Sequence, residues 1–100
     1  MKARFLLPAR RELGEAVRYY NAQRAGLGDE FRDEAWATIE RVKHFPLAWQ
    51  PLGRNIRRCQ MRRFPYGIIY EPLSQSGESR IIVIAVACLH REPEYWRSRV

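Results

Sequence analysis

Arginine is the residue type in this chain whose chemistry stands out most, and four arginines lie close together in one stretch. They are Arg57, Arg58, Arg62 and Arg63. A guanidinium group binds phosphate or carboxylate through a planar fork of donors, and it stacks on aromatic rings and bases. His90 adds an imidazole, the side chain best suited to moving a proton near neutral pH. These residues could hold an anion, and His90 could exchange a proton with it.

The charge of the whole chain agrees with this chemistry. Lys and Arg number 18 against 11 Asp and Glu, which gives a net charge of +7. Lysine occurs only as Lys2 and Lys43, so sixteen of the eighteen cations (18 − 2) are arginine. Such a balance predicts a nucleic acid or an acidic protein as partner. A general bias of the genome towards arginine is the alternative.

Strand alternation divides the four arginines between two faces. A strand through this stretch puts Arg58 and Arg62 on one side and Arg57 and Arg63 on the other. The second side also carries the apolar Cys59, so the first side is expected to be more exposed. We therefore predict Arg58 and Arg62 as the ligand-facing pair. In the alternative, Arg62 and Arg63 are turn charges that keep a hairpin soluble.

The apolar pattern of the first half predicts two helices after a short strand. Residues 2–7 form the strand, and Pro8 ends it. A helix then runs to about Gly26, and a second helix begins at Asp29 and ends near Pro46. Their apolar stripes are Leu13, Ala16, Val17 and Tyr20 in the first helix and Phe31, Ala35, Ile39 and Val42 in the second.

The second half of the chain predicts strands. Residues 46–55 hold two prolines and a glycine and are expected to be a loop. Strands follow at about 56–62, 66–73 and 80–87, and the last is apolar enough to be buried on both faces. A short C-terminal helix starts at Pro93. The order β-α-α-β-β-β predicts an α+β domain, in which an antiparallel helix hairpin packs on a mostly antiparallel sheet.

Length and composition limit the class of protein and the compartment that we expect for this chain. One hundred residues, 46% apolar and 29% charged, make one folded domain over residues 1–100. No apolar run approaches the ~20 residues of a membrane span, and the N-terminus lacks the features of a signal peptide. We expect a cytoplasmic protein with no membrane partner. Cys59 and Cys88 are expected to be reduced core residues, and no Cys/His spacing suits a metal, so we predict neither metal nor cofactor.

Several aromatic and charged residues have a structural role as the simpler expectation. Tyr70 should be a core residue, because Tyr66, Ile68 and Tyr70 alternate as on a half-buried sheet face. Trp96 should plug the sheet edge rather than stack on bases, and His90 could hydrogen-bond a backbone carbonyl. The remaining expectations are packing for Trp36 and Trp49 and solvated tail charges for Arg97 and Arg99.

Three motifs occur in order along the chain. The first helix carries A-x-x-E-L-x-E-A-x-x-Y-Y, from Ala9 to Tyr20. R-R-F-P-Y-x-I-x-Y follows from Arg62 to Tyr70, and A-V-A-x-x-H-R-x-P-x-Y-W-x-x-R runs from Ala85 to Arg99. Together they resemble the RelE/ParE superfamily of toxins from bacterial type II toxin–antitoxin modules, along nearly the whole chain. The fold that this resemblance implies is the one predicted above from the apolar pattern.

The resemblance implies a toxin that inhibits growth unless an antitoxin encoded beside it holds it inactive, as in plasmid stabilization. RelE-like members cut mRNA in the ribosomal A site, whereas ParE-like members poison DNA gyrase. Metal-free RNA cleavage needs a group that takes the 2′-hydroxyl proton, cations around the phosphate and a donor for the leaving oxygen. The candidate catalytic residues for that reaction are Arg58, Arg62, His90, Arg91 and Tyr95.

Lysine content favours gyrase as the target. RelE-like nucleases rely on lysines in and near the second strand, but Lys2 and Lys43 lie elsewhere. Arginine holds phosphate but is a poor base at pH 7. The family's catalytic tyrosine lies in the C-terminal tail, and Trp96 can be aligned with it as well as Tyr95 can. We favour ParE-like gyrase inhibition, with ribosome-dependent mRNA cleavage as one alternative and a non-toxic nucleic-acid-binding module as another.

The antitoxin implied by the resemblance is expected to be acidic and to fold on binding, because a surplus of arginine suits pairing with carboxylates. The expected complex is a hetero-oligomer of toxin and antitoxin. The candidate partner-binding residues are Arg57, Arg58, Arg62, Arg63, Trp96 and Arg97.

Overall fold

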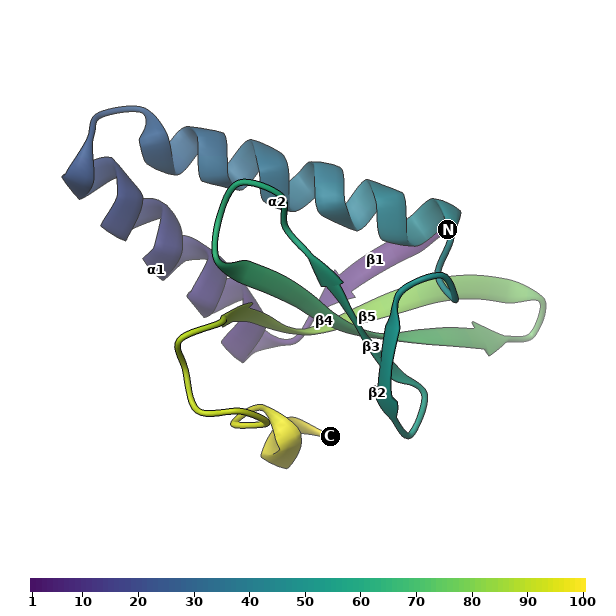
Figure 1. Ribbon diagram of the computed structural model, residues 1–100. Coiled ribbons are helices and arrows are strands. Elements are labelled where there is room, and N and C mark those ends of the chain that lie inside the picture. The colour runs from purple at the N-terminus through teal and green to yellow at the C-terminus, as the bar shows by residue number, and fades with distance from the viewer.

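Two long helices and a five-stranded sheet make up most of the chain in the computed structural model, which describes residues 1–100 (Figure 1). In chain order the elements are β1 (Lys2–Phe5), α1 (Leu7–Gln23), α2 (Leu27–His44), β2 (Gln50–Gly53), β3 (Ile56–Gln60), β4 (Tyr66–Gln75), β5 (Glu78–Cys88) and the 3-10 helix η1 (Arg97–Arg99). The α+β class is confirmed. None of the helices is long and apolar enough to cross a membrane.

The strands form one sheet in the order β1-β5-β4-β3-β2. β1 runs parallel to β5, and the other pairs are antiparallel. We call the side of the sheet that α1 and α2 cover the helix face, and the opposite side the second face. β5 contributes Ile81 and Val83 to the core on the helix face and Ile84 to a smaller core on the second face. The prediction that this strand is buried on both faces is confirmed.

Both helices form where the apolar stripes predict them, with one boundary shifted. Pro8 lies in the first turn of α1, where its missing N–H costs no hydrogen bond. α2 begins at Leu27 rather than at Asp29, because Gly26 takes a φ of 90° and turns the chain back at once. Asp29 therefore lies inside the first turn, where its charge suits the helix dipole.

A glycine brings the two helices into close contact. A Cβ atom at Gly28 would lie 2.0 Å from the carbonyl oxygen of Val17 in α1, so a larger residue would push the helices apart. The Gly28 N–H, at the start of α2, donates to the side-chain oxygen of Asn21 at 2.7 Å. This contact closes the hairpin tightly, and both apolar stripes can then face the sheet.

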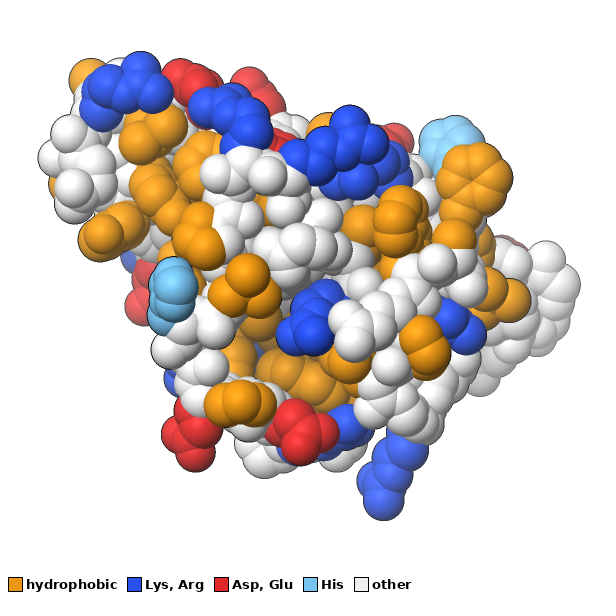
Figure 2. Space-filling model, viewed as in Figure 1, with side chains coloured by type: hydrophobic (Ala, Val, Ile, Leu, Met, Phe, Trp, Pro, Cys, Tyr) orange, Lys and Arg blue, Asp and Glu red, His pale blue; other side chains and the backbone are white.

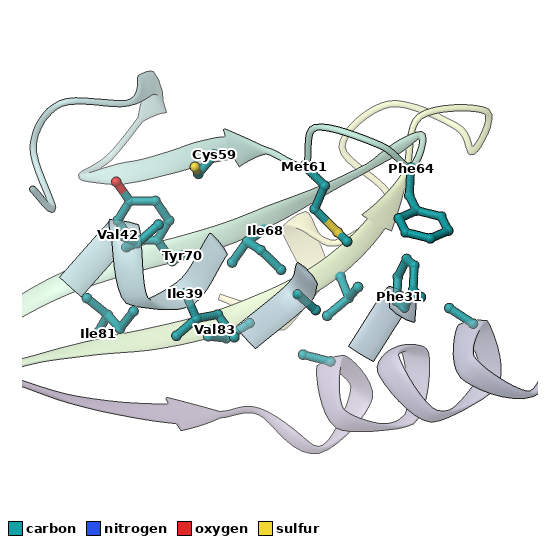
Figure 3. Packing of buried hydrophobic residues seen from close by; sticks show 14 of the residues in the cluster. Phe31, Ile39, Val42, Cys59, Met61, Phe64, Ile68, Tyr70, Ile81 and Val83 are labelled. Atoms are coloured by element: carbon teal, nitrogen blue, oxygen red, sulfur yellow. The ribbon is translucent and has the colours of Figure 1, made fainter. Parts of the chain in front are cut away.

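The main core lies between this hairpin and the helix face (Figure 3). Phe31 of α2 and Phe64, from the turn after β3, meet edge to face with ring centroids 5.0 Å apart. Tyr70 is 0% exposed, which confirms its predicted core role, and its hydroxyl donates to the carbonyl of Pro46 at 2.6 Å. Burial raises the pKa of Tyr70 to about 12. Cys59 packs in the same core as a free thiol.

Two segments differ from the prediction. Residues 50–53, expected as loop, form the edge strand β2, where Pro51 is tolerated because an edge strand leaves one side of its backbone unpaired. The C-terminal helix is only the 3-10 turn η1, which begins at Arg97 rather than at Pro93. Both segments take their shape from contacts with the rest of the sheet, and a local pattern does not contain those contacts.

Charged side chains of both signs lie together along the side of the molecule on which α2 runs (Figure 2). On α2 itself, Arg32 pairs with Asp29, and Lys43 pairs with Glu40 one turn away. Both ion pairs lie within the helix, whereas several arginines elsewhere, such as Arg4 and Arg54, have no carboxylate partner.

Candidate functional site

The C-terminal segment, which we define as residues 89–100, folds back against the second face of the sheet (Figure 1). Trp96 is 4% exposed and packs with Ile56 and Ile84. The Arg97 guanidinium donates to the carbonyl of Leu52 in β2 at 2.7 Å. Trp96 is thus a core residue, as the simpler expectation had it, although it covers a face rather than an edge. Trp96 would reach a partner only if this segment moved.

Glu12 of α1 is the centre of the hydrogen bonds that hold this segment. Its carboxylate accepts the Tyr95 hydroxyl at 2.6 Å and the Val86 N–H of β5 at 3.0 Å. Both terminal nitrogens of Arg99 donate to it at 2.9 Å, and Arg91 donates at 3.4 Å. One carboxylate therefore joins α1, β5 and the C-terminal segment.

The pair of Glu12 and Arg99 is largely shielded from solvent. The two side chains are 10% and 16% exposed, and Arg99 also donates to the carbonyl of Ile84 at 3.1 Å. A buried ion pair is stable only when its remaining donors and acceptors are satisfied, as they are here. The expectation that Arg99 is a solvated tail charge is wrong, because α1 places a carboxylate opposite it.

Tyr95 is enclosed by the same network. Burial is the main reason that its pKa is raised well above the ordinary range, and the hydrogen bond to Glu12 and that residue's negative charge raise it further. The Arg91 guanidinium lies 3.7 Å from the centre of the Tyr95 ring. Tyr95 therefore keeps its proton at neutral pH and already donates it to Glu12, so in this arrangement it is a poor general acid or base.

Three of the predicted catalytic residues share one small cavity on the second face. Arg58, Arg91 and Tyr95 line it beside Trp96, and its volume is about 90 Å³. Arg58 lies across Gly67, where a Cβ atom would be 3.0 Å from the arginine side chain. Two cations could hold a phosphate oxygen here, but the carboxylates of Glu92 and Glu94 also line the cavity, which is too small for a nucleotide.

A larger cavity, of about 320 Å³, lies between α1 and the end of β5. Glu12 and Arg91 line it together with Glu15, and so do Tyr66 and Cys88. Burial is the main cause that raises the pKa of Tyr66 to about 12. The lining thus has hydroxyl, thiol and charged groups, but no imidazole.

The other predicted arginines lie elsewhere. β3 ends at Gln60, so strand alternation does not continue to Arg62, and the prediction that Arg58 and Arg62 share one face is wrong. Glu34 of α2 accepts the backbone N–H groups of both Arg62 and Arg63, the latter at 3.0 Å. The Arg63 side chain pairs with Glu30 of α2 at 2.7 Å. This turn after β3 borders an open cavity of about 440 Å³ beside α2.

His90 and Arg57 do not line the small cavity, although Leu89 and Arg91 on either side of His90 do. His90 is exposed in the turn after β5, and its side chain makes no hydrogen bond, so the carbonyl contact expected for it is not formed. Arg57 donates to the carbonyls of Leu47 and Trp49 at 3.1 and 2.9 Å. Of the predicted catalytic set, only Arg58, Arg91 and Tyr95 are brought together.

Sequence reasoning missed Glu12 as the organising residue. A signal was present, because Glu12 belongs to the first motif and directly precedes Leu13 of the apolar stripe. An acidic residue at the border of a buried stripe needs partners when the helix packs. Among the His, Cys, Asp and Glu side chains, no group of three or more gathers where it could hold a metal ion.

Comparison with known proteins finds a solved structure of similar fold. By sequence, the chain matches no protein-family model and no curated protein. By structure, it is similar to a chain of the chromosomal ParDE TA system from P. aeruginosa, with a TM-score of 0.63 and 11% identity. The similarity covers 90% of this chain and 97% of that one. The fold is RelE/ParE-like. The fold expected from the three motifs is thereby confirmed, and residue roles do not follow from so low an identity.

Proposed function

We propose that this chain is the toxin of a toxin–antitoxin module, and that it stops growth by inhibiting DNA gyrase in the cytoplasm rather than by cutting RNA. The similarity of fold to a chain of a ParDE TA system supports the first part. The observation that carries the second part is the state of Tyr95, whose hydroxyl is bound to Glu12 and keeps its proton.

Ribonuclease chemistry finds only the carboxylates of Glu92 and Glu94 as candidate bases at the cavity where the cations gather. Cleavage needs a group that accepts the 2′-hydroxyl proton within hydrogen-bond reach of the bound phosphate. Arg58 and Arg91 could hold that phosphate, and their shared cavity is the observation that favours the alternative of mRNA cleavage. His90 does not line this cavity, and no lysine does. Inhibition of a protein target needs no such group.

The proposed partner is an acidic antitoxin that orders on binding. The net charge of +7 supports it, and so does the exposure of Arg62 and Arg63 beside α2. Arg57 and Arg58 are half-buried, whereas Arg62 and Arg63 are exposed, so we place the first contacts at the turn after β3. Trp96 and Arg97 would join only if the C-terminal segment were displaced.

Controlled expression with reporters for mRNA cleavage and for DNA damage in the same cells tests the proposal. We expect growth arrest with a DNA-damage response and intact transcripts, and inhibition of supercoiling by purified gyrase. Transcripts cut at codon boundaries would instead identify a ribosome-dependent nuclease. Unimpaired growth, together with no partner encoded by the adjacent gene, would favour the non-toxic nucleic-acid-binding module.

Two variants sharpen this test. His90→Ala should leave toxicity nearly unchanged on our proposal, because His90 is exposed and bonded to nothing. Removing a transition-state donor typically costs a nuclease ~10²–10³ in rate, so Arg91→Ala should abolish toxicity only if RNA is cut. A His90→Ala protein that stays folded and loses all toxicity would overturn gyrase inhibition.

A further inference from the structure

The second face of the sheet is only partly covered. α1 and α2 both lie over the helix face, and the C-terminal segment packs over only part of the second face (Figure 1). Beside this segment remains an open cavity of about 430 Å³, which we call the hollow. Four aliphatic side chains form its floor: Leu6, Ile56, Ile82 and Ile84. Leu6 and Ile82 are only half-buried, so aliphatic surface stays in contact with solvent here.

Ile82 of β5 lies in the middle of this floor. Its neighbours Ile81 and Val83 belong to the core on the helix face, so the Ile82 side chain points to the second face. In the sheet, Ile82 is paired with Arg4 of β1 on one side and with Glu71 of β4 on the other. Side chains of directly paired residues share a face of the sheet. Arg4 and Glu71 therefore flank Ile82 on the second face.

Cations without partners surround the hollow. Lys2 and Arg4 lie along β1, and Arg54 lines the hollow from the turn between β2 and β3. All three are exposed, and none of their side chains forms an ion pair or a hydrogen bond. Arg99 also lines the hollow, but its charge is already paired. Glu71 is the only acidic residue in the lining, so the unpaired cations outnumber the carboxylate.

These features select one kind of partner. A nucleic acid would bring phosphates to the cations, but its bases stack on aromatic rings, and no aromatic residue lines the hollow. Trp36, which was expected to be a packing residue, is 45% exposed, but it lies on the helix side against Phe5. A second copy of this chain would set cations against cations. A protein surface on which an aliphatic side chain stands between carboxylates fits both the floor and the charges.

We propose that the hollow receives such a surface from the target that this toxin inhibits. The aliphatic side chain would pack on Leu6 and Ile82, and the carboxylates would pair with Arg4 and Arg54. An apolar anchor inside a polar rim is the usual arrangement of a binding hot spot. The inference rests on the proposed function, because it takes the target to be a protein, and it deepens that function by assigning the target to the second face.

Inhibition of supercoiling by purified gyrase tests the surface. Arg4→Glu with Arg54→Glu should raise the concentration needed for half-inhibition by about tenfold or more, because carboxylates of the target would meet like charges. Ile82→Thr keeps a β-branched residue in the strand but removes apolar surface, and it should raise that concentration about threefold. The matched control is Arg10→Glu with Arg11→Glu, which alters the net charge equally at two exposed arginines of α1 without partners. The control should inhibit as well as the wild-type chain.

A second measurement tests the chemistry of the hollow without gyrase. The probe is a short peptide with two leucines between glutamates, added to the full chain labelled with ¹⁵N, and its control has lysines in place of the glutamates. We expect amide shifts at Ile82 and Ile84 with the acidic peptide alone. Unchanged shifts would overturn the hollow as a binding site, and equal shifts with both peptides would overturn its acidic preference.

The two measurements separate this inference from the proposed function. If the wild-type chain inhibits gyrase and both double variants inhibit it equally, the target does not use the hollow, and the proposed function stands. If the wild-type chain does not inhibit gyrase, the proposed function and this target are both overturned, and the peptide result still decides what the hollow binds.

Discussion

The turn after β3 and the C-terminal segment each bring arginines to a glutamate on the helix hairpin. In the turn, Arg63 and Glu30 are 57% and 41% exposed. In the C-terminal segment, Arg99 and Glu12 are 16% and 10% exposed. An exposed pair adds little stability, because water and salt screen it, whereas losing one partner of a buried pair is costly. The same two residue types thus hold the fold together in one region and remain available to a partner in the other.

The largest effect is expected from Glu12→Ala. It would leave the largely shielded Arg99 without a carboxylate and the Tyr95 hydroxyl and Val86 N–H without an acceptor. We expect the free energy of unfolding to fall by about 3 kcal/mol, measured by urea denaturation. Glu15→Ala is the matched control, because Glu15 is an exposed carboxylate of the same helix without an ion pair or hydrogen bond.

Glu12 also shows which part of the structure could not be predicted from the sequence. The stripe that contains Phe31 and Ile39 is periodic, so its burial could be predicted, and so could Tyr70, because strands alternate. The partners of Glu12 lie more than seventy residues away in the chain, as its contact with Val86 shows. No spacing rule relates residues so far apart, and the network was visible only in three dimensions.

The prediction that Arg58 and Arg62 share one face of a strand failed for a different reason. Alternation predicts faces only while the strand lasts, and the backbone N–H groups of Arg62 and Arg63 leave the ladder to bind Glu34. β2 was missed because Pro51 reads as a loop signal, although an edge strand accepts it. In both cases the competing partner was a distant residue.

A smaller effect is expected from Tyr95→Phe, which keeps the ring and removes the hydroxyl that donates to Glu12. We expect a loss of about 1 kcal/mol at neutral pH, with Tyr19→Phe as control, because Tyr19 is exposed and its hydroxyl has no partner. If the two variants lose equal stability, the Tyr95 hydroxyl does not support the network.

The stability of the protein at alkaline pH tests the role of Tyr95 in a second way. Since the folded pKa of Tyr95 is raised, the unfolded chain loses the tyrosine proton first as pH rises through about 10. The folded state then binds more protons than the unfolded one, so stability is full below that pH and falls above it. Tyr66 and Tyr70, with pKa raised to about 12, act in the same direction. Tyr95→Phe should make this fall shallower in denaturation curves measured from pH 9 to 11.

Glu34→Ala should have a modest effect in the other region. It removes the acceptor of the Arg62 and Arg63 backbone N–H groups, but water can replace it, because both residues are exposed. We expect a loss of about 1 kcal/mol, with Asp33→Ala as control, since Asp33 on the same helix binds nothing. A loss as large as that of Glu12→Ala would remove the contrast between the two regions.

The smallest effect on stability is expected from Arg63→Ala. Its pair with Glu30 is exposed, so thermal unfolding should be unchanged within error, even though the pKa of Glu30 is lowered chiefly by the hydrogen bond from Arg63.

Binding of the acidic partner is where the Arg63→Ala variant should differ from the wild-type chain. If the turn after β3 makes the first contacts, Arg63→Ala should slow association and flatten its dependence on salt, while dissociation changes little. Arg32→Ala is the matched control, because Arg32 is also an exposed arginine paired with a carboxylate, but it lies in α2 and does not line the cavity beside the turn. Equal association rates for the two variants would mean that the turn does not receive the partner, whatever its charge.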